Sequence, residues 1–389
     1  MKERWEYKKI KDIGSVVAGT TPNTNVAEYW DGSLCWISPA ELDGSHYLYD
    51  SKKKITEAAV KAKSLKLLPE GTVILSSRAP IGKVVINKIP TYCNQGFKCV
   101  VCGKGVYNEF LYWWFWGKKE YLNSLGTGAT FKEISKKVVE EIIIPVPPLS
   151  EQQSIVDYLD AAFAKIDAMK ANAEKALNEA KALFQASLKE MLEPKEGWEE
   201  KTLKEVSVFY GNYGLSVPST EYNGVRYLRI TDITEWGDLN DEKVSAKIDE
   251  NKVQELLEEG DILFARTGAT VGKTLMYKEA FGKCLFAGYL IRYRLKKDII
   301  LPKFLFYITH SENYYKWVLE NQKAAAQPNI SAKLYNEYLV LYPPLSEQQS
   351  IVETLDSLKS KVDRLQENYA KISQECDALK QAILRQVFE

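Results

Sequence analysis

The segment RTGATVGKT, Arg266 to Thr274, is the part of the sequence that comes nearest to a catalytic motif. A phosphate-binding P-loop has the pattern G-x-x-x-x-G-K-[ST], in which backbone amides surround a phosphate and the lysine reaches its outer oxygens. Here three residues, not four, separate Gly268 from Gly272-Lys273-Thr274. The segment is therefore either a degenerate ATP site or a turn that contacts a different phosphate.

The flanking sequence favours a turn between two strands. A P-loop leads from a strand into a helix, whose N-terminus helps to bind the phosphate. DILFA, before the segment, predicts a strand, and TLMYKEAF, after it, also predicts a strand because it opens with β-branched, apolar and aromatic residues. An earlier segment, GTVILSSRAPIGKVVI, shares the plan of strand, basic residue, turn, Gly-Lys and strand, which makes Arg78 and Lys83 the expected counterparts of Arg266 and Lys273.

Residues for metal or hydrolytic chemistry are scarce. The six cysteines lack the spacing of a disulfide framework, although Cys99 and Cys102 form a C-x-x-C pair. Zinc usually takes four nitrogen or sulfur ligands, and the histidines are only His46 and His310. We interpret the cysteines as apolar strand residues, with a zinc site as the alternative, and expect no metal and no cofactor.

Length and composition predict a soluble protein of more than one domain. The chain has 389 residues, of which 45% are hydrophobic and 27% charged. The sequence lacks an apolar run of membrane-spanning length and a signal-peptide core, so we expect a cytoplasmic protein without a membrane partner. The formal net charge is zero, but residues 1–148 hold 21 basic and 15 acidic residues, a net of +6 (21 − 15). A neutral total does not exclude nucleic-acid binding, because such binding depends on how the basic residues are distributed over the surface.

The strongest signal is an internal duplication. PPLSEQQSIV occurs at Pro147–Val156 and again, unchanged, at Pro343–Val352, which is 196 residues later (343 − 147). The similarity extends outward, for example from FKEIS before the first copy to QPNIS before the second. A period this long indicates a duplicated globular domain together with the segment that follows it. The expected segments are a globular domain at 1–148, a long helix at 149–193, a second globular domain at 194–342 and a second long helix at 343–389.

Each PPLSEQQ segment predicts the start of a helix. Ser150 with Gln153, and Ser346 with Gln349, have the S-x-x-Q spacing of a capping box. Beyond it, apolar residues recur in alternating steps of four and three, the heptad pattern of a coiled coil. The predicted seam consists of Ile155, Leu159, Ile166, Met169 and Leu183 with intervening alanines in the first helix, and of Ile351, Leu355, Leu358, Val362, Leu365, Ile372, Leu379 and Ile383 in the second.

Two matched helices in one chain favour an antiparallel intramolecular coiled coil over a generic oligomerisation coil. About 40 residues at 1.5 Å per residue give each helix roughly 60 Å. Because each helix follows its own globular domain, antiparallel packing predicts pseudo-twofold symmetry with the domains at opposite ends.

The globular halves predict an α+β fold. Short β-rich runs separated by turn residues indicate a twisted, mostly antiparallel sheet, and helical patterns occur near ITEAAVKAKSL and FLYWWFWGKKEYL. We interpret Trp113, Trp114 and Trp116 as core residues, with a base-stacking platform as the alternative.

Two globular domains, each followed by PPLSEQQ and a long helix, resemble the specificity (S) subunit of type I restriction–modification enzymes over essentially the whole chain. The GTTP stretch at Gly19–Pro22 and the turn with an arginine and Gly-Lys are also typical of that family. The resemblance implies two target-recognition domains that each read one half of a split, asymmetric site in double-stranded DNA, with the helices setting the gap. It further implies two methyltransferase (M) subunits and restriction (R) subunits as partners. In the family the assembled complex, and not this subunit, has adenine-N6 methyltransferase and ATP-dependent endonuclease activity.

The residues are consistent with a subunit that lacks catalytic residues. VPPLS and YPPLS fail the outer positions of the adenine-methyltransferase pattern (N/D/S)-P-P-(Y/F/W), and the P-loop is incomplete. Two alternatives stay open, the specificity subunit of a related system whose partner fuses methylation and cleavage, and a coiled-coil adaptor without a DNA role.

Candidate DNA-binding residues follow from the resemblance and from their chemistry. Basic side chains and glycine N–H groups on the two turns suit phosphates, and an arginine can also reach a guanine edge. Base-reading residues should differ between the copies, because the half-sites should differ. The candidates are Thr20, Thr21, Asn23, Lys52, Lys53, Lys54, Arg78, Lys83 and Lys132 in the first half, and Asn212, Tyr213, Arg226, Arg229, Arg266, Lys273, Gln327 and Asn329 in the second.

Overall fold

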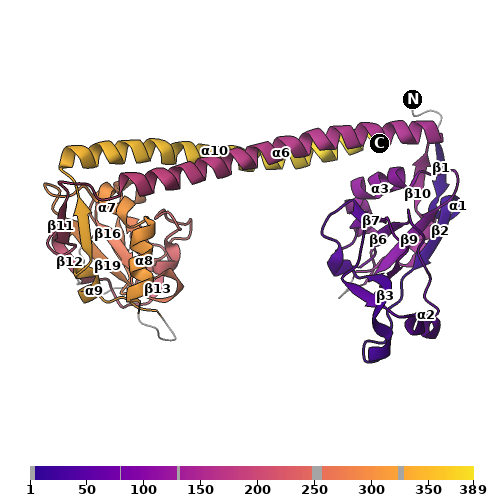
Figure 1. Cartoon of the computed structure of the whole chain (residues 1–389), viewed down its shortest axis with the longest axis horizontal. Helices are drawn as coiled ribbons and strands as arrows, with labels where there is room; N and C mark the ends of the chain where they lie inside the picture. Colours follow the sequence, from indigo (N-terminus) through magenta and orange to yellow (C-terminus); the bar gives the residue numbers. More distant parts are fainter. Residues whose placement is uncertain (1–4, 79, 129–131, 248–255, 323–327) are drawn as a thin grey trace. The chain divides into compact units, whose positions relative to one another are not determined.

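The computed structural model describes residues 5–78, 80–128, 132–247, 256–322 and 328–389. The chain divides into two compact units, unit 1 (Met1–Ala173 and Ala370–Glu389) and unit 2 (Glu174–Tyr369). Each unit combines a globular α+β part with stretches of the same two long helices, α6 (Leu149–Met191) and α10 (Leu345–Phe388) (Figure 1). The helices have 43 and 44 residues and begin where the duplicated segments predict.

None of the helices in the described ranges is both long enough and apolar enough to cross a membrane.

Unit 1 is built around a twisted sheet with the strand order β2-β9-β6-β7-β4. Neighbouring strands are antiparallel except β4, which runs parallel to β7. A second sheet has the order β5-β3-β8, and β1 pairs with β10 next to the start of α6. The elements are β1 (Glu6–Lys9), α1 (Ile10–Ile13), β2 (Gly14–Ala18), β3 (Trp30–Ile37), β4 (Tyr47–Leu48), β5 (Lys53–Ile55), α2 (Glu57–Lys63), β6 (Val73–Ser76), β7 (Val84–Asn87), β8 (Tyr92–Cys93), β9 (Phe97–Cys102), α3 (Asn108–Gly117), α4 (Lys119–Ser124), α5 (Lys136–Glu141) and β10 (Ile143–Val146).

Unit 2 repeats this plan. Its main sheet has the order β12-β19-β16-β17 with antiparallel neighbours, and β11 pairs with β20 next to the start of α10. The strands β14 and β18 form a parallel pair, and β13 pairs with β15. The elements are β11 (Glu199–Thr202), β12 (Ser207–Tyr213), β13 (Ser219–Thr220), β14 (Arg226–Leu228), β15 (Ser245–Ala246), β16 (Ile262–Ala265), β17 (Thr274–Met276), β18 (Cys284–Phe286), β19 (Leu290–Leu295), α7 (Pro302–Ile308), α8 (Glu312–Asn321), α9 (Ala332–Asn336) and β20 (Leu339–Tyr342).

The interpretation of the cysteines as strand residues is confirmed for Cys35, Cys93, Cys99, Cys102 and Cys284 and is wrong for Cys376, which lies in α10. Cys93 and Cys99 are buried, with their Sγ atoms 3.5 Å apart, and Cys102 ends β9. Burial raises the pKa of the Cys102 thiol to about 12, which keeps the thiol protonated. In the described parts of the chain His, Cys, Asp and Glu residues form no group of three or more that could hold a metal.

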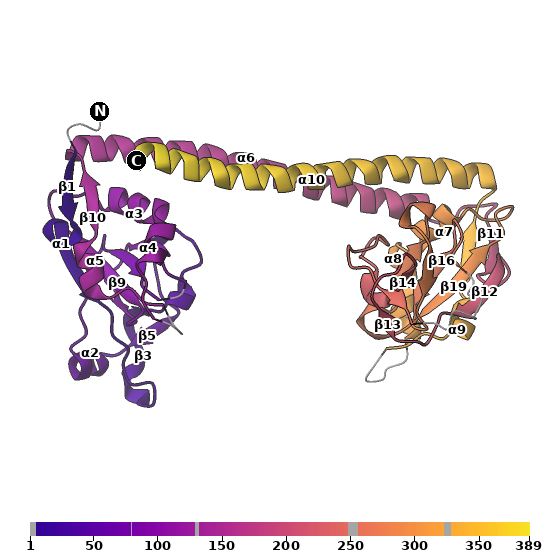
Figure 2. The same ribbon diagram turned by 180° about the vertical axis from the view of Figure 1, so that it is seen from behind.

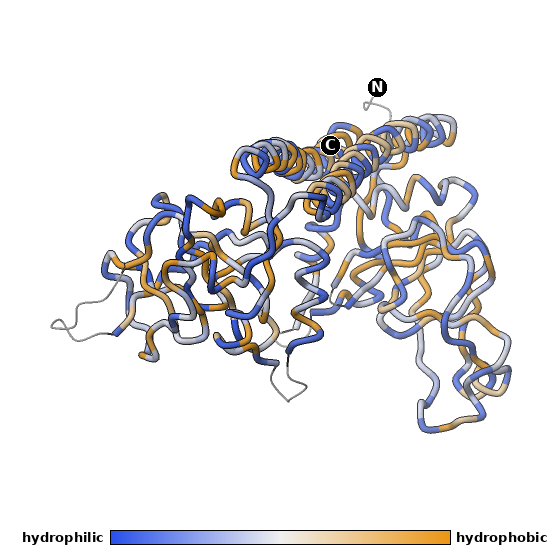
Figure 3. The backbone as a smooth tube through the Cα atoms, turned by 60° about the vertical axis from the view of Figure 1, so that its left-hand side comes forward, coloured by the Kyte–Doolittle hydropathy of each residue, from blue (hydrophilic) through white to orange (hydrophobic). Residues whose placement is uncertain are grey.

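The aromatic cluster of α3 is core, and not an exposed stacking surface. Trp113 and Trp114 are buried, and Trp113 packs edge-to-face on Phe163 of α6 at 4.8 Å between ring centroids. The hydropathy colouring of Figure 3 shows hydrophobic stretches inside the globular part of each unit, and hydrophobic and hydrophilic residues that alternate along the long helices. The core interpretation is confirmed for Trp113 and Trp114, and half-buried Trp116 packs against the same core.

In unit 1, α6 and α10 lie side by side and antiparallel (Figures 1 and 2). Cys376 Sγ of α10 lies 3.8 Å from the carbonyl oxygen of Ile166 in α6. The helix pair also packs on the domain, because Phe388 contacts Phe110 of α3 at 5.4 Å between ring centroids. The helices and the globular domain of unit 1 therefore share one hydrophobic core.

The helix pair of unit 2 forms in the same way from the other stretches of α6 and α10. Leu177, Phe184 and Leu188 of α6 share a hydrophobic core with Leu355 and Val362 of α10. That core continues into the domain through α7 and β20.

The predicted seam of α6 is shifted by one residue at several positions. Met169 and Leu183 are each 59% exposed, so their assignment to the seam is wrong, and Leu379 of α10 is 47% exposed. The residues that pack instead are one position away from the predicted ones, because the stripe of α6 must face both α10 and the domain. The buried set of α6 is Val156, Leu159, Phe163, Ile166, Leu177, Phe184 and Leu188.

Other seam residues lie between the helices or at their edge. Leu159, Ile166, Ile351, Leu355 and Val362 are buried, and the half-buried ones are Ile155, Leu358, Leu365, Ile372 and Ile383.

The predicted capping boxes are also wrong. α6 begins at Leu149, so Ser150 lies inside its first turn, and the carbonyl of Pro148 accepts hydrogen bonds from the amides of Glu151 (2.9 Å) and Gln152 (3.0 Å). The Gln153 amide reaches forward to Asp157. α10 repeats the arrangement with Pro344. The proline pair brings the chain into the helix earlier than the serine, which removes the serine from the capping position.

Candidate nucleic-acid interface

The near-P-loop is the turn of a β-hairpin. β16 and β17 pair antiparallel, so a strand, and not a helix, follows Lys273, as predicted. Thr274, which would hold magnesium in a P-loop, is buried, and its hydroxyl oxygen lies 2.7 Å from that of Thr309. The alternative of a P-loop ATP site is therefore excluded for this segment.

The glycine amides of this turn are not free for phosphates, contrary to the expectation from the sequence. Gly268 N–H donates to the carbonyl of Pro328 (3.0 Å), and Gly272 N–H donates to that of Ala265 (2.9 Å). Gly272 has φ +86°, and a Cβ there would lie 2.8 Å from Val318 of α8. The Gly-Lys pair recurs because the turn packs tightly on a helix.

The structural counterpart of Arg266 is Ser77, so the predicted pairing of Arg266 with Arg78 is wrong. Ile330 N–H donates to the Arg266 carbonyl and Ile134 N–H donates to the Ser77 carbonyl, each at 2.9 Å. Four residues separate Ser77 from Gly82 and five separate Arg266 from Gly272, so the second turn is one residue longer, and Arg78 stands one position after the counterpart of Arg266. The two turns thus place their arginines differently.

The lysines of the two turns also differ. Lys83 Nζ donates to the Leu42 carbonyl at 2.7 Å, so this ammonium holds a neighbouring loop of unit 1. Lys273 is half-buried. The lysines of the shared Gly-Lys pair thus have different surroundings in the two units, and their contact with phosphates stays a prediction.

In unit 1 three charged side chains form a cluster at the β6–β7 turn. Arg78 Nε lies 3.0 Å from Glu133 Oε2, and Lys98 Nζ lies 3.1 Å from Glu133 Oε1. Lys98 Nζ also donates to Ser77 Oγ at 3.0 Å. Burial alone would raise the pKa of the Glu133 carboxyl, but hydrogen bonds from Lys98 and Arg78 outweigh it and hold the pKa below its ordinary value. Glu133 stays ionised and orients both cations.

The GTTP loop lies next to the loop that precedes β9. The Thr21 hydroxyl donates to Gln95 Oε1, and Asn94 Nδ2 donates to Thr21 Oγ1 at 2.8 Å. The backbone N–H of Thr20 donates to the Cys93 carbonyl at 2.8 Å. Gln95 is exposed, and its place in a turn was the only sign of it in the sequence.

In unit 2 the corresponding cluster is aromatic and neutral around its arginine. The Arg266 guanidinium lies over the Tyr213 ring, 4.8 Å from its centroid, and Arg266 Nε donates to Asn329 Oδ1 at 3.3 Å. The Tyr213 hydroxyl accepts a hydrogen bond from the Ala332 amide at 2.9 Å, which fixes the ring. Half-buried Asn212 and exposed Tyr213 line a small pocket of about 130 Å³.

The two clusters come from equivalent elements. In unit 1 the cluster combines the β6–β7 turn, the loop after β2, the loop before β9 and the segment before α5. In unit 2 it combines the β16–β17 turn, the end of β12, the loop before β19 and the segment before α9. Their side chains differ, with Arg78, Lys98 and Glu133 in unit 1 and Arg266, Tyr213 and Asn329 in unit 2. Equal position with unequal chemistry is the property that two different half-sites require. We call these two surfaces the loop clusters.

The lysine run of unit 1 lies on β5 and the loop before it. Lys52 and Lys53 are exposed, and Lys53 Nζ lies 5.9 Å from the Trp30 ring centroid. Half-buried Lys54 pairs with Asp50, which raises the pKa of the lysine. Asn23 is exposed in the GTTP loop, and Lys132 is exposed beside Glu133. Lys132 and Asn23 have side chains accessible to a ligand.

Arg226 is buried in unit 2, and Arg229 is half-buried. Arg226 is 5% exposed, and its guanidinium donates to the carbonyls of Asn240 (2.7 Å) and Glu242 (2.8 Å). Arg229 pairs with buried Asp232 at 2.7 Å, and this hydrogen-bonded pair raises the arginine pKa above its ordinary value. The burial of Arg226 argues against base contacts by its side chain. Gln327 lies outside the described residues.

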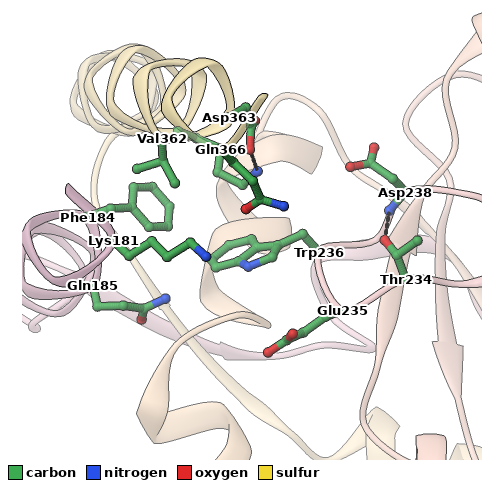
Figure 4. Close-up of a pocket in the computed structure, with 11 residues that line it drawn as sticks. Lys181, Phe184, Gln185, Thr234, Glu235, Trp236, Asp238, Val362, Asp363 and Gln366 are labelled. Atoms are coloured by element: carbon green, nitrogen blue, oxygen red, sulfur yellow. Dashed lines mark hydrogen bonds and ion pairs between the residues drawn. The ribbon is translucent and has the colours of Figure 1, made fainter. Parts of the chain in front are cut away.

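A larger pocket of unit 2 lies away from its loop cluster. It has about 600 Å³ and lies between the helix pair and the turn Thr234–Asp238, with Lys181 and Phe184 on one side and Trp236 on another (Figure 4). Trp236 stacks on His310 at 4.9 Å between ring centroids, and Lys359 Nζ lies 5.3 Å from the Trp236 centroid. The contact between Trp236 and Lys359 of α10 therefore holds this turn against the helix pair.

The comparisons with known proteins agree with this architecture. The chain matches the family model of the type I restriction modification DNA specificity domain twice, at residues 2–179 and 195–374. The specificity subunit of the EcoKI enzyme of Escherichia coli K12 is 28% identical, covering 99% of this chain and 89% of that protein. The MjaIX specificity subunit of Methanocaldococcus jannaschii is 46% identical, but over 40% of this chain and 37% of that protein.

Solved structures share the fold over the whole chain. A structure described as showing complex assembly and conformational transition of the type I R-M system has a TM-score of 0.78 at 21% identity, covering 100% of this chain and 98% of that one. The HsdS subunit from Thermoanaerobacter tengcongensis has a TM-score of 0.62 at 19% identity, with coverages of 100% and 97%. The chain therefore belongs to the family of type I restriction–modification specificity subunits, which recognise DNA and are not themselves enzymes.

Proposed function

We propose that this chain recognises a split, asymmetric site in double-stranded DNA, with the loop cluster of unit 1 on one half-site and that of unit 2 on the other. The observation that carries the proposal is the placement of unlike side chains on equivalent loops. Arg78 is held by the carboxylate of Glu133, whereas Arg266 is held by the ring of Tyr213 and the amide of Asn329. An arginine oriented by such neighbours suits the O6 and N7 acceptors of guanine or a phosphate.

The paired long helices would separate the two recognition domains. A helix of 43 residues has a length of roughly 65 Å at 1.5 Å per residue. One turn of B-DNA is about 34 Å long, so this length allows two half-sites a turn or more apart with unread bases between them. We further propose two methyltransferase subunits and the restriction subunits as partners, which would supply adenine-N6 methylation and ATP-dependent cleavage.

Coexpression with the partner methyltransferase tests this function. The modified bases are mapped across a genome, and we expect one motif in two unlike halves with methylated adenine in each. Methylation of a continuous or palindromic motif would contradict the proposal. A copurifying partner that fuses methylation and cleavage would place the chain in the related class of system.

Binding by the chain alone separates DNA recognition from an adaptor role. We expect the logarithm of the binding constant for a duplex with both half-sites to fall linearly with the logarithm of salt concentration. A coiled-coil adaptor would bind no DNA at any salt concentration.

A further inference from the structure

We infer that Gln152 and Gln348 are positioning residues that fix each recognition domain on its long helix, and that they thereby determine the spacer length that the protein accepts. The inference rests on the proposed function, because it concerns how the two half-sites are held apart. It assigns a role to two residues of the identical PPLSEQQ segments whose polarity alone would predict an exposed side chain.

The Gln152 side chain joins three segments of unit 1. It is fully buried, and its Oε1 accepts a hydrogen bond from the Tyr107 amide, just before α3, at 2.8 Å. Its Nε2 donates to the carbonyl of Gly105 at 3.1 Å and to that of Pro147 at 2.8 Å. One carboxamide therefore connects the first turn of α6, the start of α3 and the loop before it.

Gln348 makes the same connections in unit 2. Its side chain is fully buried, its Oε1 accepts from the Leu301 amide at 2.8 Å, and its Nε2 donates to the carbonyls of Ile299 (2.9 Å) and Pro343 (2.8 Å). The partners are backbone groups, so the recognition domains can diverge in sequence while the joint keeps the same geometry.

A second hydrogen bond lies two turns further along each helix. Asp160 of α6 accepts from Trp113 Nε1 of α3 at 2.9 Å. Asp356 of α10 accepts from the hydroxyl of Tyr307 of α7. Two polar contacts about 12 Å apart, eight residues at 1.5 Å each, prevent the helix from tilting on the domain. We call each pair of contacts the helix–domain joint.

The glutamine requires both ends of a carboxamide. A glutamate would keep an acceptor for Tyr107 or Leu301, but it would place an oxygen against two carbonyl oxygens in a buried position. The adjacent Gln153 and Gln349 are exposed and bond only to Asp157 and Glu353 of their own helices. Gln152 and Gln348 thus contact the globular domain, whereas the glutamines next to them do not, so Gln349 provides a matched control for Gln348.

A small tilt at the joint would change the spacing on DNA. A tilt of about 5° displaces the far end of a helix of roughly 60 Å by about 5 Å. This displacement exceeds the rise of one base pair, about 3.4 Å along a strand. A rigid joint is therefore needed if the protein is to distinguish spacers that differ by one base pair.

The experiment measures spacer selectivity in the full chain coexpressed with its methyltransferase. Plasmids carry the two half-sites at the natural spacing and at one base pair more or less, and methylation of each is read by sequencing. In Gln348→Glu we expect the ratio of methylation at the altered spacings to that at the natural spacing to rise by about tenfold, the factor that one lost buried hydrogen bond represents. Gln349→Glu should keep the wild-type ratio.

Tyr307→Phe gives a milder variant that keeps the packed ring and removes only the hydroxyl that donates to Asp356. It should shift the ratio in the same direction, and it preserves the test where Gln348→Glu does not fold. An unchanged ratio in Tyr307→Phe and in folded Gln348→Glu, or an equal loss at all spacings, overturns the inference and leaves the proposed function standing. A wild-type protein that methylates no split site overturns the proposed function and the inference with it.

Discussion

Lys380 of α10 connects the two long helices of unit 1 through Asp167 of α6. Its Nζ lies 2.5 Å from Asp167 Oδ1 and 5.2 Å from the centroid of the Phe163 ring, and its side chain is 15% exposed. The aliphatic stem of the lysine covers the ring while the ammonium reaches the carboxylate. This contact explains why residue 380, and not Leu379, faces α6.

Replacement of this lysine should weaken the helix pair. Lys380→Glu removes the contact with the ring and sets two carboxylates against each other, so we expect the free energy of unfolding to fall by about 1–2 kcal/mol. Urea unfolding followed by tryptophan fluorescence measures the change. Lys371→Glu, at an exposed position of the same helix, should cost less than about 0.5 kcal/mol. Equal costs would show that the Lys380 contact adds no stability.

Two leucines of α6 test the corrected seam. Leu177 is 5% exposed and Leu183 is 59% exposed. Leu177→Ala should lower the free energy of unfolding by about 3 kcal/mol, because it leaves a cavity in the core, whereas Leu183→Ala should change it by less than about 0.5 kcal/mol. Denaturant midpoints of the two variants provide the comparison, and a larger effect at Leu183 would restore the register predicted from the sequence.

His310 should make unit 2 sensitive to mild acid. Burial lowers the pKa of its imidazole from 6.5 to about 4. Between these values the unfolded chain binds a proton that the folded chain excludes, so the stabilisation is present above pH 6.5 and is lost as the pH falls toward 4. The loss should amount to about 3 kcal/mol.

His310→Phe isolates this effect because it keeps a ring against Trp236 and removes the titrating group. The difference in unfolding free energy between wild type and variant should be constant above pH 7 and should shift in favour of the variant below pH 6. Parallel pH profiles would contradict the assignment.

The Arg266 side chain should contribute to recognition of one half-site. Removing a guanidinium that contacts a base costs about 1–3 kcal/mol, so we expect Arg266→Ala to weaken DNA binding by about ten- to a hundredfold. Arg364→Ala, on the exposed face of α10, is the matched control and should bind as wild type. Titration of duplexes mutated in one half-site at a time shows which half loses its effect, and a loss shared equally by both halves would refute the assignment of Arg266 to one of them.

Thr274 tests the exclusion of an ATP site. Its hydroxyl bonds to Thr309 inside the protein, so Thr274→Val should lower the free energy of unfolding by about 1 kcal/mol. Magnesium and ATP should leave the melting temperature of the isolated wild-type chain unchanged. A rise in that temperature that is absent in the variant would point to a nucleotide at this turn.

The duplicated organisation and the long helices were predictable from the sequence. The identical PPLSEQQSIV segments mark the start of each helix, and steps of three and four predict its length, because both signals are local. The register of α6 was not predictable from the same signals. Met169 and Phe163 belong to adjacent stripes of one helix, and only packing against both α10 and α3 selects between them.

The loop clusters were predictable in position but not in detail. The turn with Arg266 was recognised from its residues, whereas its counterpart was misplaced because the two turns differ by one residue. Glu133 and Gln95 were missed, since nothing in a single sequence shows which loops meet in space. Gln152 was missed for another reason, namely that a polar residue on a helix is ordinarily exposed.

The division of the long helices between the units has a consequence for synthesis. The core of unit 1 includes Cys376, Leu384 and Phe388, which a ribosome adds about 200 residues after it has completed Ala173. Until then Phe110 and Phe163 lack part of the apolar surface that covers them in the native protein, and an exposed aromatic face of a nascent chain is a site for chaperones or for aggregation. Unit 1 is thus begun before unit 2 but completed after it, once residues 370–389 have been made.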